Sequence, residues 1–451
     1  MGVMRVFSRL FGNKEPELNN VDMHQFTPLP ESGYLVGGAV RDTLLGRKTS
    51  DLDWVVPDPE RSAKEAGGAL DGSAFVLDAE RGHWRVVAGG ETRDYAPLTG
   101  GIEENLGARD FTVNALALDL EGNLIDPTGG RRDLQAKTLR MVSKENLTSD
   151  PLRPLRGVRF TATLGFALES ETAEAIRQHA AAQISGDEPL PAWERVGEEL
   201  NQLMRSEHAA QGVNRLHKLG PLKVYLPELS EAEGVEQGSL HHLDVLNHSI
   251  EALNQLLHGF PDADLELRWG TLLHDIGKPP TKDYDDLQRR MTFYAHDKVG
   301  GDLAKRMLRR LRQPSDLAER VGALVRYHML PLPKNQKEAR RFVHRRRELL
   351  PDLLKLMIAD REAARGRRAS EAGRQVYRLA LGRVLEILAE PAPEKPLLDG
   401  RDVMALLDLS PGPKVGEAVR LVQEAEAVGD VRSRGEAEEV LRRYAREQGW
   451  V

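Results

Sequence analysis

Hydrophobic and polar positions follow two different patterns along the chain. Between residues 30 and 145, short runs of β-branched and aromatic residues alternate with glycine-rich turns, and residues 73–78, 83–88 and 122–131 are examples. Such runs predict strands. Beyond residue 150, apolar residues recur at helical spacing among Leu, Ala, Arg and Glu, which favours helices. The pattern predicts an α+β protein with a small α/β head and a long helical body.

Proline-rich segments interrupt the helical pattern and indicate joints between helical layers. They lie at residues 187–191, 329–333 and 390–396. The length of 451 residues suggests two to four domains.

The composition excludes several classes of chemistry. The chain has no cysteine, which rules out disulfides, thiolate metal sites and a cysteine nucleophile, and it fits a reducing compartment. No apolar run approaches the roughly 20 residues that span a bilayer. Residues 1–11 have an apolar stripe but no signal-peptide cleavage site. We therefore expect a soluble cytoplasmic protein without a membrane partner, preceded by a short amphipathic leader.

The net charge of −7 argues at first against a nucleic-acid partner, but the distribution of charge matters more than its total. Basic clusters lie at residues 305–312, 340–347 and 365–368. Such clusters are usually solvated helix faces. A surface that follows a phosphate backbone remains the alternative.

The candidate chemistry begins with two carboxylates, Asp51 and Asp53. Residues i and i+2 of a strand point to the same face, so both carboxylates can hold the same hard cations. Two Mg²⁺ ions about 3.5–4 Å apart serve in-line displacement at phosphorus. Upstream, Gly37 and Gly38 allow a close backbone approach to a polyphosphate, and Arg41 adds a cationic donor. The segment predicts nucleoside triphosphate chemistry.

These residues also carry a family resemblance. The segment 37–42 (GGAVRD), followed by Asp51-x-Asp53, resembles the class II tRNA nucleotidyltransferases and the bacterial poly(A) polymerases. Further matching segments are 109–117 (RDFTVNALA), 126–140 (DPTGG…LR), 149–160 (SDPLRPLRGVRF) and 194–200 (ERVGEEL). The resemblance implies a nucleotidyltransferase head with a mixed sheet, followed by an elongated helical neck.

The resemblance also implies roles for particular residues. Asp51 and Asp53 would hold two Mg²⁺ ions, with Asp94 as a third catalytic carboxylate. Arg109 and Asp110 would contact the nucleotide sugar, with Asn114 beside the site. The triphosphate would be bound by Gly38, Arg41, Arg156 and Arg159. Glu and Arg of the segment 194–200 would form salt bridges that position the template helix. One departure is Ala108, where the family usually has an arginine.

The segment 149–160 is expected to act as an amino-acid template for the incoming base. Asp150, Arg153, Arg156 and Arg159 recur every third residue and are therefore predicted on one side of a helix. In the family, the Asp and the first Arg hydrogen-bond the Watson–Crick edge of C or A, for which carboxylate and guanidinium are suited. Ser149 stands where the family has a Glu that orients this Arg. The choice between C and A is therefore altered or supported differently.

The interval between Asp94 and Arg109 is short. Relatives that add a complete CCA, or only the terminal A, have a longer flexible segment here, and the short form resembles the CC-adding members. We expect transfer of CMP from CTP to the 3′ end of tRNA with release of pyrophosphate. Full CCA addition or A addition with ATP remains the alternative, and no DNA partner is expected.

A second set of residues resembles the HD phosphohydrolase domain. Its expected metal ligands are His248, His274, Asp275, His296, His328 and Asp360. Imidazoles and carboxylates suit Mn²⁺, Fe²⁺, Ni²⁺ or Mg²⁺, and a metal-activated water could attack a phosphate ester. An RNA-binding scaffold without hydrolase activity remains open, as does an HD phosphohydrolase whose head only binds nucleotides.

The predicted domains follow from these motifs. They are a leader (1–27), a nucleotidyltransferase head (28–145), a helical neck with the template (146–240), an HD domain (241–370) and a helical tail expected to bind tRNA (371–451).

Overall fold

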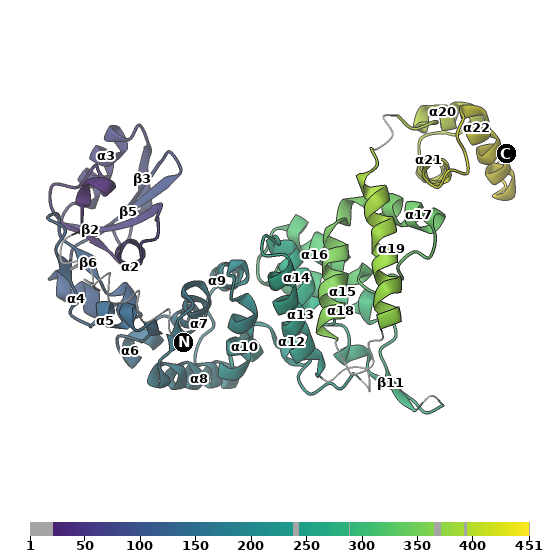
Figure 1. Cartoon of the computed structure of the whole chain (residues 1–451). Coiled ribbons are helices and arrows are strands. Elements are labelled where there is room, and N and C mark those ends of the chain that lie inside the picture. The colour runs from purple at the N-terminus through teal and green to yellow at the C-terminus, as the bar shows by residue number, and fades with distance from the viewer. Residues whose placement is uncertain (1–20, 238–242, 288, 365–370, 392–394, 451) are drawn as a thin grey trace, which may run out of the picture. The chain divides into compact units, whose positions relative to one another are not determined.

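A computed structural model provides the structure, and it describes residues 21–237, 243–287, 289–364, 371–391 and 395–450. The chain divides into two compact units, Met1–Tyr225 and Leu226–Val451 (Figure 1). In the described ranges, no helix combines the length and apolar character needed to cross a lipid bilayer.

The first unit contains a seven-stranded mixed sheet with the strand order β3-β4-β5-β2-β1-β6-β7. The strands are β1 (Tyr34–Val36), β2 (Asp51–Val56), β3 (Ser73–Asp78), β4 (His83–Ala88), β5 (Glu91–Pro97), β6 (Ala117–Leu118) and β7 (Leu124–Ile125). β2 and β5 pair in parallel, while the other neighbours pair antiparallel. The mixed sheet is confirmed, and β3 and β4 occupy the predicted residues 73–78 and 83–88. The prediction of a strand at residues 122–131 is largely wrong, because only Leu124–Ile125 form one and a helix begins at Gly130.

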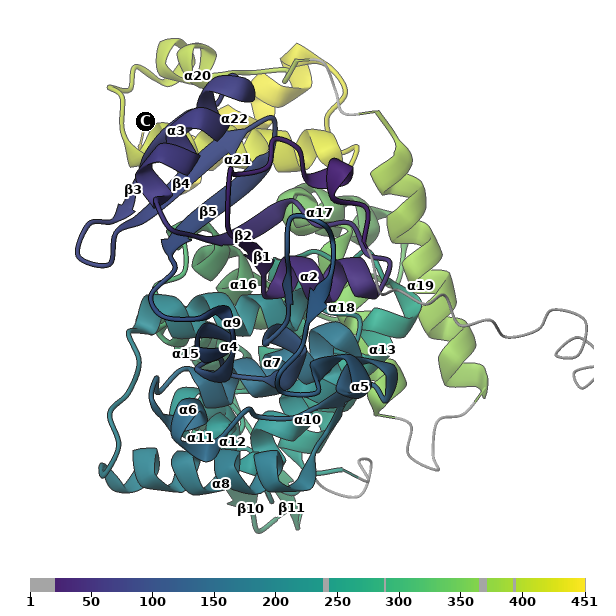
Figure 2. The same ribbon diagram turned by 90° about the vertical axis from the view of Figure 1, so that its left-hand side faces the viewer.

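Short helices cover this sheet. They are α2 (Gly38–Leu44), α3 (Pro59–Ala69), α4 (Ile102–Gly107) and α5 (Gly130–Gln135), with the 3₁₀ turn η2 (Thr112–Asn114). Helix α3 begins with Asp58, whose side chain accepts from the Arg61 amide, and with Pro59 in the first turn, both of which favour a helix start. The helix lies against β3, β4 and β5 (Figure 2), and its buried residues include Ala63 and Ala66.

Part of the expected leader packs against the head. The 3₁₀ turn η1 (Met23–Phe26) buries both Met23 and Phe26. Buried Arg93 of β5 donates to the carbonyl oxygens of Phe26, Thr27 and Pro28. Residues 21–27 therefore form part of the fold, and residues 1–20 lie outside the described residues.

The predicted helical neck follows the head. Its helices are α6 (Lys144–Thr148), α7 (Arg153–Leu164), α8 (Ser170–Ser185), α9 (Trp193–Arg205), α10 (Ala209–Leu219) and α11 (Pro221–Tyr225), with the strand pair β8 (Thr138–Leu139) and β9 (Ala167–Leu168). α7 is packed by α8, α9 and α10. A Cβ on Gly157 would lie 2.9 Å from the Phe111 ring, so this glycine lets the template helix approach the head closely.

The second unit is mainly helical. It contains α12 (Pro227–Ser230), α13 (Val245–Gly259), α14 (Leu265–Leu273), α15 (His296–Arg310), α16 (Ser315–Tyr327), α17 (Gln336–Arg346), α18 (Asp352–Ala363) and α19 (Glu371–Ala389). The 3₁₀ turns η3 (Pro279–Thr281) and η4 (Arg347–Leu349), and a strand pair β10 (Asp283–Asp285) and β11 (Arg290–Thr292), complete this part. Three further helices, α20 (Gly400–Leu407), α21 (Pro413–Ala427) and α22 (Arg434–Glu447), surround a hydrophobic core of their own.

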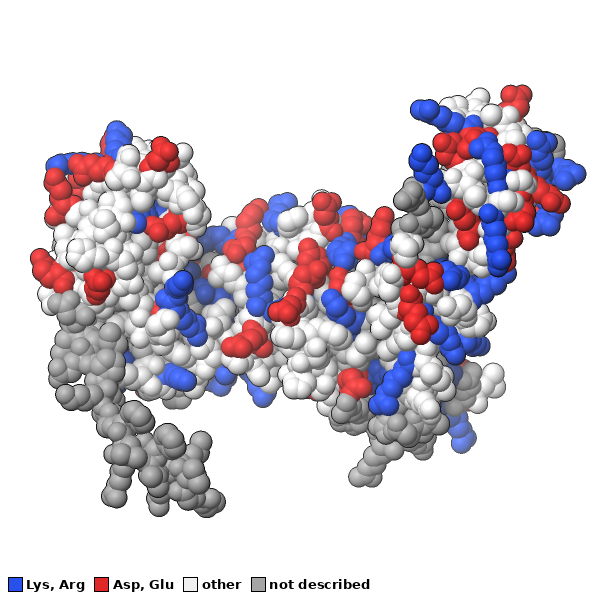
Figure 3. All heavy atoms as spheres, turned by 45° about the horizontal axis from the view of Figure 1, so that its top comes forward, with Lys and Arg blue, Asp and Glu red and all other residues white. Residues whose placement is uncertain are grey.

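The basic clusters noted in the sequence are largely paired with acidic side chains. Lys305 and Arg309 both contact Glu319, and Arg341 and Arg345 both contact Glu424. Lys and Arg are accordingly interspersed with Asp and Glu on the visible face (Figure 3). Because exposed ion pairs contribute little free energy, these pairs add little to the stability of the fold. The cluster 365–368 lies outside the described residues.

Candidate active site

The carboxylates of the head lie in one row across the sheet. Asp53 of β2 is paired with Asp94 of β5, and Asp94 is paired in turn with Arg85 of β4. Directly paired residues point to the same face. Asp51 lies two residues before Asp53 on β2, on that same face, and both are exposed. The structure therefore brings the three predicted carboxylates to one face of the sheet.

The ionisation of Asp53 reflects this crowding. Neighbouring protein atoms partly desolvate its carboxylate and raise its pKa, and the negative charges of Asp94 and Asp51 add to this effect. The charges of Arg109 and Arg85 oppose it. A divalent cation would relieve the remaining repulsion, and carboxylate oxygens are the donors that Mg²⁺ prefers. The donor set therefore fits the Mg²⁺ site predicted from the sequence.

Gly37 holds the turn between β1 and α2 in a conformation that suits glycine, with φ +74° and ψ −131°. A Cβ at this position would lie 2.6 Å from Nη1 of Arg109 and 3.5 Å from Oδ2 of Asp53. The bare backbone therefore leaves the space that the Arg109 guanidinium occupies beside Asp53. Burial lowers the pKa of Arg109, while the charge of Asp53 raises it.

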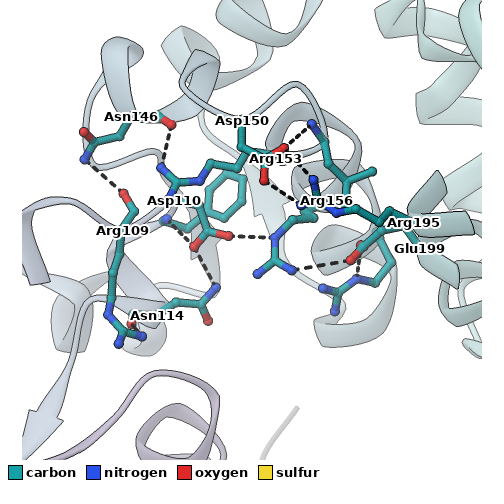
Figure 4. Close-up of polar contacts among 12 residues, drawn as sticks. Arg109, Asp110, Asn114, Asn146, Asp150, Arg153, Arg156, Arg195 and Glu199 are labelled. Carbon is teal, nitrogen blue, oxygen red and sulfur yellow. Dashed lines mark hydrogen bonds and ion pairs between the residues drawn. The ribbon is translucent and has the colours of Figure 1, made fainter. Parts of the chain in front are cut away.

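A chain of polar contacts connects the head to the template helix (Figure 4). Arg41 donates from Nη1 to Oδ1 of Asn114 at 2.6 Å, and Asn114 donates from Nδ2 to Asp110 at 3.1 Å. Asp110 also accepts from Nε of Arg156 at 2.9 Å. Burial alone would raise the pKa of Asp110, but Arg156 and these hydrogen bonds bring it below its usual value. Asp110 therefore works as a buried anion.

Glu199 of α9 is the last member of this series of polar contacts and belongs to the neck. It accepts from Arg156 at 3.4 Å and from Arg159 at 2.8 Å. Arg159 and Glu199 are both buried, and the Arg159 guanidinium stacks on the Phe160 ring at 3.6 Å. The predicted salt bridges between the segment 194–200 and the template helix are confirmed.

These contacts bear on the predicted phosphate ligands. Arg41 donates to Asp42 and Asn114, and Arg159 donates to Glu199. Both guanidinium groups therefore form their hydrogen bonds with side chains of the protein itself. Arg156 is the more accessible of the three, with a third of its side chain exposed. Its role toward a triphosphate remains a prediction.

The template differs from expectation in one respect. Helix α7 begins at Arg153, so Asp150 lies in the preceding turn and does not share one helix side with Arg153, Arg156 and Arg159. Pro151 explains this, because the residue before a proline is disfavoured in the helical region, whereas Pro154 lies in the first turn of the helix, where proline is tolerated. Asp150 instead caps this turn, accepting from the Leu152 amide at 3.0 Å.

Asp150 and Arg153 have separate partners (Figure 4). Arg195 donates to Asp150 at 2.6 and 3.3 Å, and burial opposes but does not outweigh this contact, so the pKa of Asp150 is lowered. Arg153 donates from Nη1 to the Asn146 carbonyl at 2.7 Å, to the Ser149 hydroxyl at 3.2 Å and to the Ala108 carbonyl at 3.3 Å. Neutral oxygens thus orient Arg153 where the family has a carboxylate.

The second unit gathers the six predicted HD residues. Mutually close ligand atoms come from His248, His274 and Asp275 in one group, and from Asp275, His296 and His328 in a second. Asp360 lies 3.0 Å from Nε2 of His248 and 3.6 Å from Nε2 of His274. The structure therefore confirms the spatial grouping that the order of motifs predicted.

The histidine tautomers suit a metal. Nδ1 of His274, His296 and His328 each lies 2.6–2.8 Å from the backbone carbonyl three residues earlier, so Nδ1 carries the proton. The buried Nε2 atoms of these three residues make no hydrogen bond within the described ranges. Such orphaned nitrogens beside Asp275 are the arrangement that a metal ion satisfies. Without a metal, burial opposes protonation of His274, but Asp275 and Asp360 raise its pKa to about 10.

Sequence reasoning missed Arg85, which donates from both Nε and Nη2 to the two oxygens of Asp94 at 2.7 Å. The sequence did contain a signal for this pair, because Gly89 and Gly90 form the turn between β4 and β5. A two-residue turn pairs 88 with 91 and therefore 85 with 94. The partnership of Arg195 with Asp150 had no comparable signal, because it depends on how α9 packs.

The chain matches known families along most of its length. The Poly A polymerase head domain matches residues 33–94 and 83–140, the Probable RNA and SrmB- binding site of polymerase A matches residues 165–233, and the HD domain matches residues 240–365. Head, neck and HD body thus correspond to three known modules.

Similar proteins extend this correspondence to the whole chain. An A-adding tRNA nucleotidyltransferase from Deinococcus radiodurans is 53% identical over 93% of this chain and 97% of its own length. A CC-adding tRNA nucleotidyltransferase from Thermus thermophilus is 47% identical over 91% of this chain and 93% of its own. The chain belongs to the tRNA nucleotidyltransferase family.

Solved structures share the fold. The Bacillus stearothermophilus CCA-adding enzyme in complex with CTP has a TM-score of 0.62 and 23% identity over 95% of this chain and 96% of its own. The Thermotoga maritima CCA-adding enzyme complexed with tRNA has a TM-score of 0.57 and 22% identity over 92% of this chain and 91% of its own.

Proposed function

We propose that this tRNA nucleotidyltransferase adds cytidine residues, from CTP, to the 3′ end of tRNA. The observation that carries the proposal is the short connection between the third carboxylate and Arg109. Strand β5 ends at Pro97 and α4 begins at Ile102, so residues 98–101 alone join them. The longer segment that resemblance associates with full CCA or A addition has no counterpart between these elements.

In the proposed reaction, the terminal 3′-hydroxyl oxygen of tRNA attacks the α-phosphorus of CTP. A phosphodiester bond forms, the bond to the β-phosphate breaks, and pyrophosphate leaves. Asp51 and Asp53 would hold two Mg²⁺ ions, which when bound promote loss of the hydroxyl proton and neutralise phosphate charge. Arg109, whose guanidinium lies beside Asp53, would contact the nucleotide sugar.

Base selection is proposed to use Asp150 and Arg153. A carboxylate accepts from the exocyclic amino group of cytosine, and a guanidinium donates to its ring nitrogen or carbonyl oxygen. Three neutral oxygens orient the guanidinium of Arg153, while Arg195 fixes the carboxylate of Asp150. These contacts would hold both groups before the base arrives.

A addition is the second candidate, because the Deinococcus radiodurans relative is named as an A-adding enzyme. A product-length assay separates the two. A tRNA ending at the discriminator base and a tRNA ending in CC would each be incubated with CTP, ATP or both. Growth of the first by two residues with CTP, and no growth of the second with ATP, is expected. One-residue growth of the second with ATP, or three-residue growth of the first, refutes CC addition.

The second unit is proposed to bind a divalent metal and hydrolyse phosphate esters. The buried, unsatisfied Nε2 atoms support metal binding. A cavity of about 330 Å³ in the second unit is lined by residues that include Lys334, Arg361, Tyr377 and Arg383, and this volume lies within the usual range for ligand sites. Its cationic lining suits an anionic ester.

Metal-dependent hydrolysis of a chromogenic phosphodiester tests this second activity. His274→Ala should abolish it while nucleotide addition continues, and Asp51→Ala should have the opposite effect. Hydrolysis that persists in His274→Ala, or that needs Asp51, would contradict the proposal.

A further inference from the structure

Arg85 binds the carboxylate of Asp94, which is the third carboxylate of the head. Its Nε and Nη2 atoms each donate to one oxygen of Asp94 at 2.7 Å. This two-point contact is the strongest geometry available to a guanidinium and a carboxylate. About a third of the Arg85 side chain and a quarter of the Asp94 side chain remain exposed, so the pair can open without unfolding the sheet.

Arg85 takes both oxygens of Asp94, although Asp94 stays close enough to Asp53 for their charges to interact. Asp94 and Asp53 are direct partners across β5 and β2, yet the groups of close ligand atoms found in the described ranges are both in the HD unit. Asp51, Asp53 and Asp94 do not form such a group. The backbone therefore places Asp94 beside Asp53, while its carboxylate is turned to Arg85.

The charge of Arg85 acts on the whole row. It interacts electrostatically with Asp51 and Asp53 as well as with Asp94. Arg85 thus supplies part of the positive charge that a divalent cation would supply to the same carboxylates.

We propose that Arg85 is a positioning residue that competes with the divalent cation for Asp94. This inference rests on the proposed metal site of the head. In the metal-free protein Arg85 holds Asp94, and loading of the metal requires Asp94 to exchange the guanidinium for the cation. The guanidinium therefore sets the metal concentration at which the third carboxylate joins Asp51 and Asp53.

The test compares four full-length variants with the wild type: Arg85→Gln, Asp94→Asn, the double variant, and Arg81→Gln as a matched control. Arg81 lies in the turn before β4, and its nearest carboxylate is Asp78 at 3.7 Å. Two quantities would be measured: the Mg²⁺ concentration for half-maximal nucleotide addition, and the affinity for Mn²⁺ from the electron paramagnetic resonance signal of the free ion. The HD residues are the same in every variant, so differences report on the head.

Arg85→Gln removes both the competitor and a positive charge, and both changes favour the cation. We expect the half-maximal Mg²⁺ concentration to fall by about three- to tenfold, the range for a partly exposed charge pair, with a matching gain in Mn²⁺ affinity. In the Asp94→Asn background only the loss of charge remains, so the same substitution should have a clearly smaller effect, and Arg81→Gln should resemble the wild type. A purely structural role would lower activity without strengthening metal binding.

Two results would overturn the inference: an unchanged or higher Mg²⁺ requirement in Arg85→Gln, or an equal effect of that substitution with and without Asp94. Asp51→Asn distinguishes this failure from failure of the proposed metal site. If Asp51→Asn weakens Mn²⁺ binding while Arg85→Gln has no effect, only the role of Arg85 is refuted. If neither changes Mn²⁺ binding, the metal site of the head is refuted as well.

Discussion

Gly37→Ala should damage the active site through one contact. The added Cβ would lie 2.6 Å from Nη1 of Arg109, about 0.8 Å short of the 3.4 Å at which ordinary contact begins. The backbone must also hold alanine at φ +74°, which costs about 1–3 kcal/mol, partly offset by about 0.4–1 kcal/mol from the unfolded chain. A net loss of about 2 kcal/mol corresponds to a fall in Tm of about 4–8 °C for a unit of this size.

The activity should fall further than the stability. Arg109 must retreat by nearly 1 Å from its place beside Asp53, and a displacement of about 1 Å in an active site can cost about 100-fold in rate. We expect kcat/KM for CTP incorporation into tRNA to fall by about 10- to 100-fold. Single-turnover addition measured well below the new Tm separates this effect from unfolding.

Gly38→Ala is the matched control for stability, because its Cβ would lie 3.6 Å from Arg41 and the residue has no positive φ. Equal losses of Tm in the two variants would refute the steric argument. A second check uses Arg109→Lys, which lacks the clashing Nη1. If the contact is the cause, Gly37→Ala should cost less stability in that background.

Three further predictions concern other parts of the chain. Glu199→Gln should lower the free energy of unfolding by about 3 kcal/mol because it leaves buried Arg159 without its anion. The control Glu198→Gln, at an exposed position, should change the free energy of unfolding by less than about 0.5 kcal/mol. Equal urea midpoints for the two variants would contradict this. The pKa of Asp110 lies below its usual 3.8, so its stabilising effect is complete above that value and is lost as the pH falls through the lower folded pKa. Asp110→Asn should therefore weaken the fall in Tm between about pH 4 and pH 2.5, and an unchanged slope would argue against a buried anion. His274→Ala should abolish Mn²⁺ binding to the HD residues, measured by calorimetry, while exposed His258→Ala should not; retention in both would place the metal elsewhere.

The sequence predicted the backbone better than the side-chain contacts. Residues 73–78 and 83–88 form strands as predicted, because alternation and flanking glycines are local signals. The HD residues also came together as predicted, since their motif order implied one cluster. Asp150 did not fall within the template helix, although the two prolines beside it were visible in the sequence.

Side-chain partners were harder to predict because they depend on tertiary packing. The substitution of Ser149 for the family's Glu indicated that Arg153 is supported differently, but it could not show that two carbonyl oxygens and a hydroxyl accept its hydrogen bonds. Likewise, burial of Arg41 and Arg159 followed from contacts with Asn114 and Glu199 that lie more than 35 residues away in the chain.

The polar chain from Arg41 to Glu199 has a consequence for how this protein can change over generations. Each member satisfies its neighbour, so the loss of an inner member removes a hydrogen-bond partner from the residue on either side of it. Single substitutions should therefore be purged even when a combination of two would be tolerated. Among descendants of this chain, Asn114, Asp110, Arg156 and Glu199 should persist or be replaced together, and the head and the neck should be inherited as one unit.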